Sequence, residues 1–441
     1  MSKIILKNGF VVAGGVVQEL DVLIDEGKIV DLVKWGKVEA TDFKAIECRG
    51  KYLIPGVVDV HVHFRDPGAI YKEDFESGSL AALSGGITTV LDMPNNIPAI
   101  VNNGALSGKR KLIEGRSYCN YGLYMGYDGK NLDEILNAIN IVGVKVYMGG
   151  STNANGVSFS EVEELFKKYD GLIVVHAEDQ EIIEENIKKT LVGVEGVEIP
   201  ASVHSKIRTV QAEVKAIRHA CELAKRYGKR VHVAHVSSEE GLKVVVEYKQ
   251  AGVEVTCEVT PHHLTFSRDD YELLGNFIKV NPPVRDKEDV FALWKGLKFG
   301  DIDIVASDHA PHTSVEKKLP YAEAPSGVPG EETMLPLFLN AVNDKAMEIT
   351  EVVKFLCEKP AKIFGLKSKG KLEKWYDADI VVVDLDKEKK VDNKKLFTKC
   401  GWSPYNGYTF KGWPVMTFVN GELAFKNGKA EEGKLGKEVK F

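Results

Sequence analysis

The chain has 441 residues, of which 44% are hydrophobic and 28% charged, as expected of a globular protein that can bury a large core. Its formal net charge of −6 combines 58 basic with 64 acidic residues, which argues against nucleic acid or anionic lipid as a partner. The six cysteines are widely spaced and form no CxxC pair, so a zinc-finger or disulfide framework is excluded.

Segments that could enter a membrane are not evident in the sequence. No stretch reaches the ~20 consecutive apolar residues that a membrane helix needs. The opening segment, MSKIILKNGF, turns polar before the apolar core of a signal peptide can form. We therefore expect a cytoplasmic protein that does not cross a membrane.

Short β segments fill the start of the chain, at residues 3–12, 21–33 and 43–56, and the pattern then changes at about Val57 to compact apolar runs separated by stretches of helical period. Amphipathic helices are expected between most of these runs, for example at residues 160–169, 209–227 and 238–252. The eight runs lie at residues 57–64, 88–94, 119–125, 143–148, 171–178, 230–237, 253–260 and 303–309. Eight successive βα units predict an α/β fold with a closed (β/α)8 TIM-like barrel.

After about Gly365 the β pattern returns, at residues 371–386 and 413–429, with a hairpin signal at Asn420-Gly421. The lysine-rich run at 386–395 is mixed in sign, and we expect it to be a solvated loop. Two domains follow from these patterns. Residues 55–365 are predicted to form the barrel, and residues 1–54 and 366–441 to form the two halves of one small β-sandwich domain.

Ligand-type side chains recur at the ends of the expected barrel strands. His61 and His63 stand at positions i and i+2, so both imidazoles project from one face and suit a single metal ion, although such a pair also occurs in ordinary packing. His176, His235 and Asp308 end the fifth, sixth and eighth runs, where barrel enzymes carry their chemistry. Four strand ends that converge on one mouth favour a metal site over a structural role.

Lys145 ends the fourth run and is expected to face the same mouth. A buried ammonium beside a dication is unfavourable, so either this is a surface lysine or it is carboxylated by carbon dioxide. The carbamate is an anion whose two oxygens can bridge two metals, and the residues alone leave both alternatives open. Two metals acidify a bridging water, and Asp308 is the natural proton shuttle, which gives hydrolysis of a C–N bond or the reverse condensation.

A set of motifs extends this pattern over nearly the whole chain, which resembles the amidohydrolase superfamily and, within it, the long-chain class I dihydroorotases. Each motif is weak alone, but the set in this order is highly specific. The matching segments are HVHFRDPG from His61, GVKVYMGG around Lys145, VVHAED at His176, VAHVSS at His235, VTPHHL around His262, NPPVR from Asn281, SDHAPH from Ser307 and GVPGEET from Gly327.

The resemblance implies a metal centre with two zinc ions, although cobalt or manganese also suits such donors. Asp308 would act as general acid and base, taking a proton from the bridging hydroxide and delivering it to the departing nitrogen. One metal would be bound by His61, His63 and Asp308, the second by His176 and His235, with an N6-carboxylated Lys145 as the bridge.

The resemblance also implies a substrate, since the family catalyses the reversible cyclisation of N-carbamoyl-L-aspartate to L-dihydroorotate in pyrimidine biosynthesis. Arg65 would grip the substrate carboxylate, for which a guanidinium fork is suited. The family is compatible with aspartate transcarbamoylase as a partner and with a homo-oligomer. The implied substrate-binding residues are Arg65, Asn95, Asn281, His312, Pro329 and Gly330, with Gly327 in the same loop as the last two.

Two positions differ from what many members of the family carry. Asn96 stands where threonine is common and Glu331 where an apolar residue is common, and we expect both to be peripheral. Some members use an aspartate from a DDG-like segment in place of the lysine. Here no such acidic pair follows Lys145, which supports the lysine bridge.

Two rival interpretations compete with dihydroorotate chemistry. Allantoinases and dihydropyrimidinases resemble this chain in the metal ligands but usually lack arginine at the position of Arg65, so Arg65 and Asn281 together favour dihydroorotate. The second rival is an inactive scaffold of the superfamily, and the presence of all six candidate metal residues argues against it.

Overall fold

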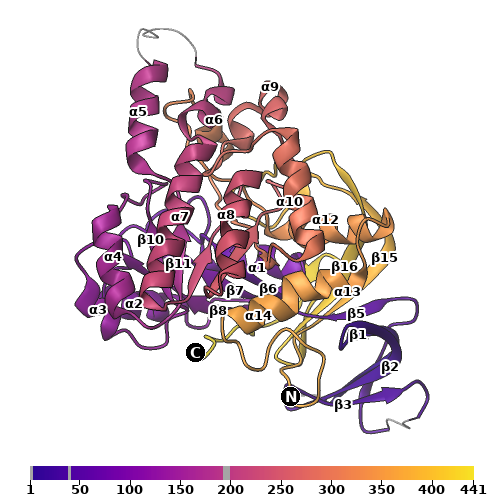
Figure 1. Ribbon diagram of the computed structural model, residues 1–441. Helices are drawn as coiled ribbons and strands as arrows, with labels where there is room; N and C mark the ends of the chain where they lie inside the picture. The colour runs from indigo at the N-terminus through magenta and orange to yellow at the C-terminus, as the bar shows by residue number, and fades with distance from the viewer. Residues whose placement is uncertain (1–2, 38–40, 192–198) are drawn as a thin grey trace.

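The computed structural model describes residues 3–37, 41–191 and 199–441, and it confirms the predicted α/β barrel (Figure 1). Each expected apolar run contains a strand, and almost every strand residue is buried because helices cover the outside of the barrel. The strands are β6 (Val57–Val62), β7 (Ile87–Asp92), β8 (Asn120–Leu123), β9 (Met125–Tyr127), β10 (Val144–Tyr147), β11 (Ile173–His176), β12 (Val231–Val233), β13 (Val255–Val259) and β14 (Ile304–Val305).

The strands pair in parallel and close on themselves. The hydrogen-bonded order is β6-β7-β8 in one sheet and β14-β13-β12-β11-β10-β9 in the other. β8 and β9 follow each other with only Tyr124 between them, which joins the two sheets on one side. On the other side a parallel bridge between Val62 and His309 links the end of β6 to the segment after β14. All carboxyl ends therefore meet at one mouth.

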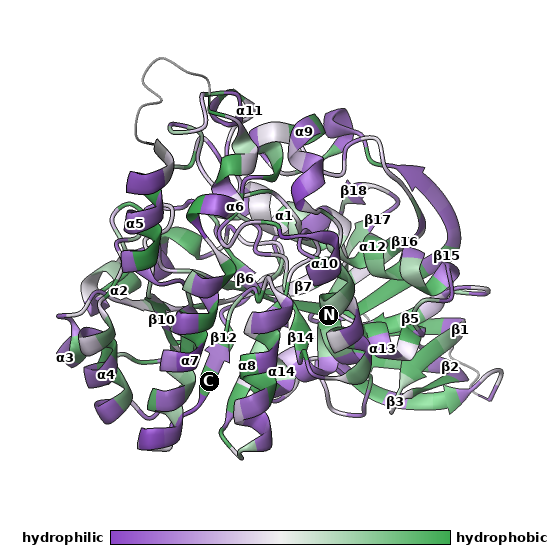
Figure 2. Ribbon diagram, turned by 45° about the horizontal axis from the view of Figure 1, so that its top comes forward, coloured by the Kyte–Doolittle hydropathy of each residue, from purple (hydrophilic) through white to green (hydrophobic). Residues whose placement is uncertain are grey.

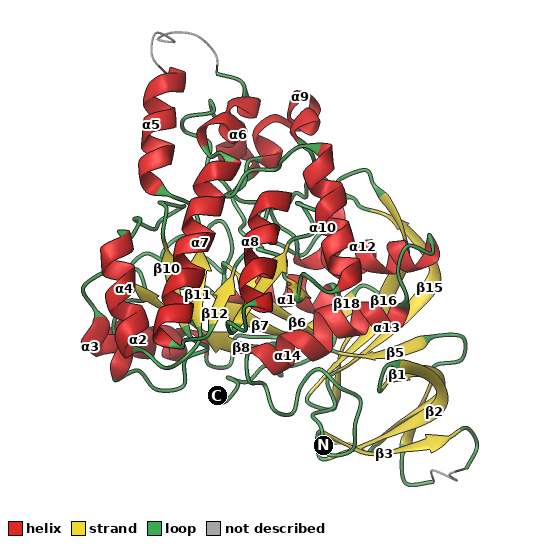
Figure 3. Ribbon diagram, in the orientation of Figure 1, coloured by secondary structure: helices red, strands yellow, loops and turns green. Residues whose placement is uncertain are grey.

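Helices surround these strands, as Figure 3 shows. Several begin where a side chain caps the first turn, such as Ser158 before α4, Thr209 before α7 and Ser238 before α8. The longer helices are α1 (Phe75–Ser84), α2 (Asn103–Ile113), α4 (Phe159–Lys168), α5 (Gln180–Leu191), α7 (Val210–Tyr227), α8 (Glu239–Gln250), α10 (Lys287–Phe299) and α12 (Glu331–Asn343). Shorter ones are α3 (Leu132–Leu136), α6 (His204–Ile207), α9 (Tyr271–Leu274), α11 (Ser314–Lys317), α13 (Ile349–Val353) and α14 (Lys359–Ile363).

Both ends of the chain contribute to one further sheet, which lies beside the barrel in Figure 1. β5 pairs with β1 in parallel and with β15 in antiparallel orientation, so a single nine-stranded sheet joins the two terminal segments. Its strands are β1 (Ile4–Ala13), β2 (Val16–Asp25), β3 (Lys28–Lys34), β4 (Lys44–Glu47), β5 (Tyr52–Pro55), β15 (Ile380–Lys390), β16 (Thr409–Val419), β17 (Glu422–Lys426) and β18 (Lys429–Ala430). The division of the chain at residues 55 and 365 stays a prediction.

Local turn chemistry agrees with the sequence at the hairpin between β16 and β17. Asn420 and Gly421, between β16 and β17, have φ of 51° and 83°, the pair of positive values that an Asn-Gly hairpin turn requires. The lysine-rich run departs from the expectation of a loop, because β15 continues to Lys390 along β16, where Glu388 pairs with Lys411.

Apolar residues gather on the strands and on the inner sides of the helices, and polar residues line the outer sides, as Figure 2 shows. All six cysteines are buried and free. Among the described residues, no helix combines the length and apolar character needed to cross a membrane.

Candidate metal centre and substrate pocket

Three ligand-type side chains meet at the mouth of the barrel. His61 lies near the end of β6, His63 follows that strand, and Asp308 follows β14. Asp308 Oδ1 lies 3.3 Å from His61 Nε2 and 3.0 Å from His63 Nε2. Within the described residues, these are the one set of three histidine, cysteine or acidic side chains whose donor atoms all lie within 4.8 Å of one another.

A second pair of histidines adjoins this set. His176, the last residue of β11, places Nδ1 3.0 Å from Nε2 of His235, which follows β12. The ring centroids of His61 and His235 are 5.3 Å apart, so the two groups share one site. His235 and Asp308 both adopt a positive φ, of 36° and 45°, and such strained backbone is concentrated at functional sites.

Three of these four imidazoles donate a hydrogen bond from one ring nitrogen to a side-chain oxygen. His61 Nδ1 donates to Glu258 Oε1 at 2.5 Å, and His63 Nδ1 donates to Asn95 Oδ1 at 2.6 Å. His176 Nε2 donates to Glu178 Oε2 at 2.9 Å. With one ring nitrogen carrying a proton toward an oxygen, the other presents a lone pair to the centre, which is the arrangement found around metal-bound histidines.

The electrostatics of the site favour neutral imidazoles and an ionised carboxylate. Burial lowers the pKa of His63 to about 4 and takes the pKa of His235 well below its usual value. Although burial alone would raise it, the pKa of Asp308 lies well below its usual value because His61 and His63 face the carboxylate. Neutral imidazole and carboxylate are the forms that bind metal.

Lys145 lies within β10, fully buried, and its Nζ has no hydrogen-bond partner. Burial lowers its pKa to about 8, although Glu258 and Asp308 oppose the shift. The structure therefore excludes the alternative of an exposed surface lysine. Its amine lies near the carboxylates of Glu258 and Asp308 and near the rings of His176 and His235. The imidazoles and the Asp308 carboxylate form a donor set that fits divalent metal binding.

Arg65 provides the cation of the neighbouring pocket. It is buried, with Nε donating to the carbonyl of Pro311 at 3.2 Å and Nη2 lying 3.3 Å from His312 Nε2, while Nη1 has no partner. His312 Nε2 donates to the carbonyl of Ser326 at 3.0 Å, and Lys72 Nζ donates to His312 Nδ1 at 3.0 Å. A guanidinium with a free, buried N–H group is ready to bind an anion.

The other expected substrate residues divide into two groups. Asn95, Asn281 and Gly327 line the same cavity as the metal residues and Arg65. His312 stands behind Arg65, outside that lining. Pro329 and Gly330 line a separate small pocket next to Glu331, and the N–H of Gly330 donates to His309 Nδ1.

Several residues of the site were given no role from the sequence. Glu258 and Glu178 hold ligand histidines, and Arg208 forms a partly buried ion pair with Glu178. Tyr147 and Thr152 line the cavity. A charged residue inside a buried strand, as Glu258 is in β13, is the one clue that the sequence offered. A larger cavity of about 440 Å³ lies against α12 and β15–β17, but no histidine lines it.

Similarity to known proteins agrees with the metal site described above. Residues 52–424 match the amidohydrolase family. The dihydroorotase of Methanosarcina mazei is 36% identical over 99% of this chain and 98% of its own length, and that of Carboxydothermus hydrogenoformans is 37% identical over 96% and 98%. Among solved structures, the L-hydantoinase (dihydropyrimidinase) of Arthrobacter aurescens matches all of both chains with a TM-score of 0.94 and 34% identity.

The chain belongs to the amidohydrolase family. It is a metal-dependent cyclic amidohydrolase, as the resemblance implied, and its relatives of similar length carry the name dihydroorotase.

Proposed function

We propose that this enzyme interconverts N-carbamoyl-L-aspartate and L-dihydroorotate, the reversible ring closure of pyrimidine biosynthesis. The observation that carries the proposal is Arg65, a buried cation with an unpartnered N–H group in the cavity that also contains the metal residues. Both compounds present a carboxylate, for which a guanidinium is the complementary group. The full-length dihydroorotase relatives support the same assignment.

The metal centre would hold two zinc ions. His61, His63 and Asp308 would bind one, His176 and His235 would bind the other, and carboxylated Lys145 would bridge them. Carboxylation needs a neutral amine, which burial of Lys145 favours. When bound, the metals would supply an acidified water and polarise the substrate carbonyl.

Asp308 would move the proton. In the hydrolytic direction its carboxylate accepts a proton from the attacking water and delivers it to the ring nitrogen as the amide bond breaks. In the synthetic direction Asp308 starts protonated, so low pH favours ring closure and high pH favours ring opening. Asn281 would orient the substrate from the cavity wall.

Hydantoin hydrolysis is a second candidate, since the L-hydantoinase of Arthrobacter aurescens matches this chain at 34% identity and a TM-score of 0.94. A hydantoin ring needs the same metal chemistry but presents no carboxylate to Arg65. Activity toward dihydroorotate and toward hydantoin therefore distinguishes the two candidate functions.

Replacing Arg65 by glutamine tests the assignment. We expect kcat/KM for dihydroorotate to fall about 100- to 1000-fold, the loss typical of removing one member of a buried charge pair, while metal content stays that of the wild type. Arg226→Gln is the matched control, because Arg226 is an exposed arginine of α7 that pairs with Glu163. Unchanged dihydroorotate kinetics in Arg65→Gln, or a wild-type enzyme that opens hydantoin but not dihydroorotate, would contradict the proposal.

Expectations about assembly rest on the family alone. A complex with aspartate transcarbamoylase and a homo-oligomer stay predictions, to be tested by light scattering of the protein alone and mixed with that enzyme.

A further inference from the structure

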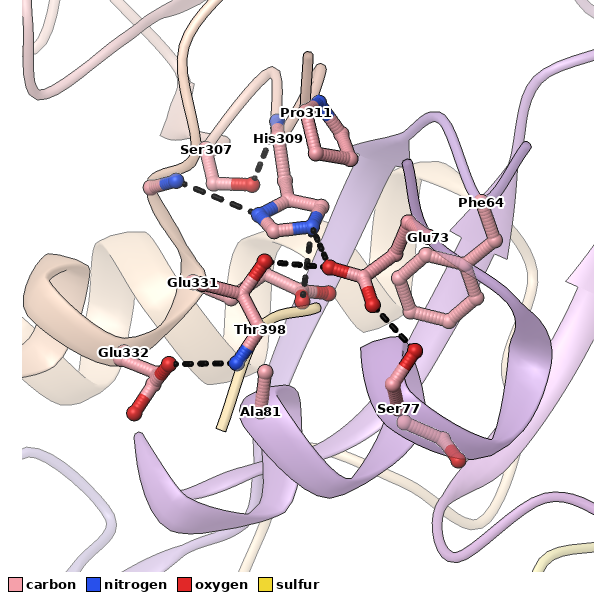
Figure 4. Close-up of polar contacts among 12 residues, drawn as sticks. Phe64, Glu73, Ser77, Ala81, Ser307, His309, Pro311, Glu331, Glu332 and Thr398 are labelled. Carbon is pink, nitrogen blue, oxygen red and sulfur yellow. Dashed lines mark hydrogen bonds and ion pairs between the residues drawn. The ribbon is translucent and has the colours of Figure 1, made fainter. Parts of the chain in front are cut away.

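A buried polar cluster lies directly behind Asp308, outside the residues that line the metal cavity. Figure 4 shows its members around His309, the residue that follows Asp308. His309, Glu73 and Glu331 are all buried, with at most 1% of each exposed. None of them has a role in the chemistry proposed above, yet burying two carboxylates together is costly unless the arrangement serves a purpose.

His309 is oriented on both sides of its ring. The backbone N–H of Gly330 donates to Nδ1 at 3.2 Å, so the ring proton belongs on Nε2. Nε2 lies 3.5 Å from Glu73 Oε2 and 3.6 Å from Glu331 Oε2, as the dashed lines of Figure 4 mark. Phe64 packs edge-on against the ring, with centroids 6.0 Å apart. The Gly330 N–H and the Phe64 ring therefore hold the imidazole, while the two carboxyls face Nε2 without a hydrogen bond to it.

Glu73 is in turn fixed by a segment from the other end of the chain. Thr398 Oγ1 and Ser77 Oγ donate to its carboxylate, and the N–H of Lys399 donates at 3.1 Å and 3.2 Å to the two oxygens. We name residues 397–402 the C-terminal strap, since this stretch precedes β16 and lies across the barrel residues. The strap also contributes Trp402, whose Nε1 donates to the carbonyl of His312 at 2.6 Å.

Glu331 completes the cluster, facing the same ring nitrogen of His309 as Glu73 does. Neither of its carboxyl oxygens has a hydrogen-bond partner, and burial together with the charges of Asp59 and Glu73 raises its pKa well above the usual value. Of the two carboxyls that face His309, Glu73 is therefore the one that hydrogen bonds hold in place, from Thr398, Ser77 and Lys399.

The backbone connects His309 to the metal residues Asp308 and His63. Asp308 has a φ of 45°, a conformation that a residue other than glycine holds only when its surroundings impose it. The next residue, His309, accepts the N–H of His63 on its carbonyl at 2.8 Å and donates its own N–H to Ser307 Oγ at 2.9 Å. Fixing His309 thus fixes Asp308 and His63 together.

We propose that Thr398 and Glu73 are positioning residues for Asp308, which act through His309 so that the C-terminal strap sets the geometry of the metal centre. The inference deepens the proposed function and rests on Asp308 being a metal ligand and proton carrier. It assigns a catalytic purpose to a segment that lies outside the barrel.

Thr398→Val tests the proposal, because valine keeps the shape of threonine and removes the hydroxyl that donates to Glu73. Thr398→Ser keeps the hydroxyl and should restore function. Thr417→Val is the matched control, since buried Thr417 of β16 donates to the carbonyl of Leu83 at 3.1 Å and touches neither Glu73 nor His309. Each protein is reconstituted with Co²⁺, and its visible absorption spectrum, dihydroorotate kinetics and melting temperature are measured.

In Thr398→Val we expect a changed Co²⁺ spectrum and a kcat lower by about 10-fold with KM unchanged, because a small displacement of a catalytic group slows chemistry more than binding. Thr398→Ser and Thr417→Val should match the wild type in spectrum and kcat. If Thr398→Val fails to fold, Glu73→Gln takes its place with the same expectations.

Two results overturn the inference: a wild-type spectrum and kcat in Thr398→Val, or an equal loss in Thr417→Val, which would show a general effect of lost stability. The spectrum reports the ligand geometry whatever the substrate is. A wild-type enzyme without activity toward dihydroorotate would therefore contradict the proposed function and leave the spectroscopic test of the strap intact.

Discussion

At the scale of single residues, the sequence predicted the histidines of the site but not the groups that hold them. His61, His63 and His176 could be found because each stands at or near a strand end beside a motif. Glu258 could not be paired with a histidine in this way, because its partner His61 lies 197 positions away in the chain. Which carboxylate reaches which imidazole depends on the closure of the barrel, and no local pattern carries that information.

Glu258→Gln should weaken metal binding by about 10- to 100-fold, the usual effect of removing the partner behind a metal-bound histidine. The carboxylate accepts from His61 Nδ1 and also pairs with His232 at 3.1 Å, so its loss frees the ring to turn. Competition with a chromophoric chelator measures the affinity. Asp379→Asn is the control, since Asp379 is also buried but pairs with Lys369, in the segment that leads into β15. An affinity for metal that is unchanged in Glu258→Gln would contradict a metal at His61.

At the scale of elements, periodicity predicted the positions of helices and strands closely, as for α8, expected at 238–252 and found at Glu239–Gln250. Charged residues predicted secondary structure and burial less well. The lysine-rich end of β15 is a strand because β16 supplies backbone hydrogen bonds to it, while its side chains stay in solvent. The buried Glu331 at the start of α12 was equally unexpected, since an ionised carboxyl is normally favoured at a helix N-terminus for its charge.

Glu332, in the first turn of α12, should make the protein less stable as the pH rises. Burial raises its pKa to about 7, even though the N–H groups of Phe397 and Thr398 donate to it. Because the folded state holds the proton more tightly than the unfolded chain, this carboxyl contributes full stability below pH ~4.5, and the contribution is lost as the pH rises through about 7.

Glu332→Gln should remove this dependence, since glutamine can accept the same two N–H groups without a charge. We expect the variant to gain on the order of 1–2 kcal/mol in the free energy of unfolding at pH 8 and nothing at pH 4. Denaturant unfolding at a series of pH values measures the difference. Parallel pH profiles for the two proteins would show that Glu332 titrates normally.

At the scale of the whole molecule, the nine-stranded sheet ties the two ends of the chain to the barrel. Leu53 and Ile54 of β5 pair with Val382 and Val381 of β15, so residues more than 300 positions apart are neighbours. Trp402 of the strap then reaches His312 beside Arg65. The sequence predicted that the terminal segments form one β domain, but it held no sign that this domain supports the active site, because such contacts are non-local.

Metal binding should consequently stabilise barrel and terminal sheet as one unit. A metal at a thousand-fold excess over its Kd adds about 4 kcal/mol to the free energy of unfolding, provided it binds the folded state alone.

Of the five tryptophans, only Trp294 lies between residues 55 and 365, so tryptophan fluorescence mainly reports on the terminal segments. Far-UV circular dichroism reports on the whole chain, including the helices of the barrel. We expect removal of metal by a chelator to lower the midpoints of both transitions equally, because the β5–β15 pairing and the strap leave no terminal segment free to unfold alone. If removal of the metal leaves the fluorescence midpoint unchanged and lowers the dichroism midpoint, the terminal sheet unfolds independently of the site it adjoins.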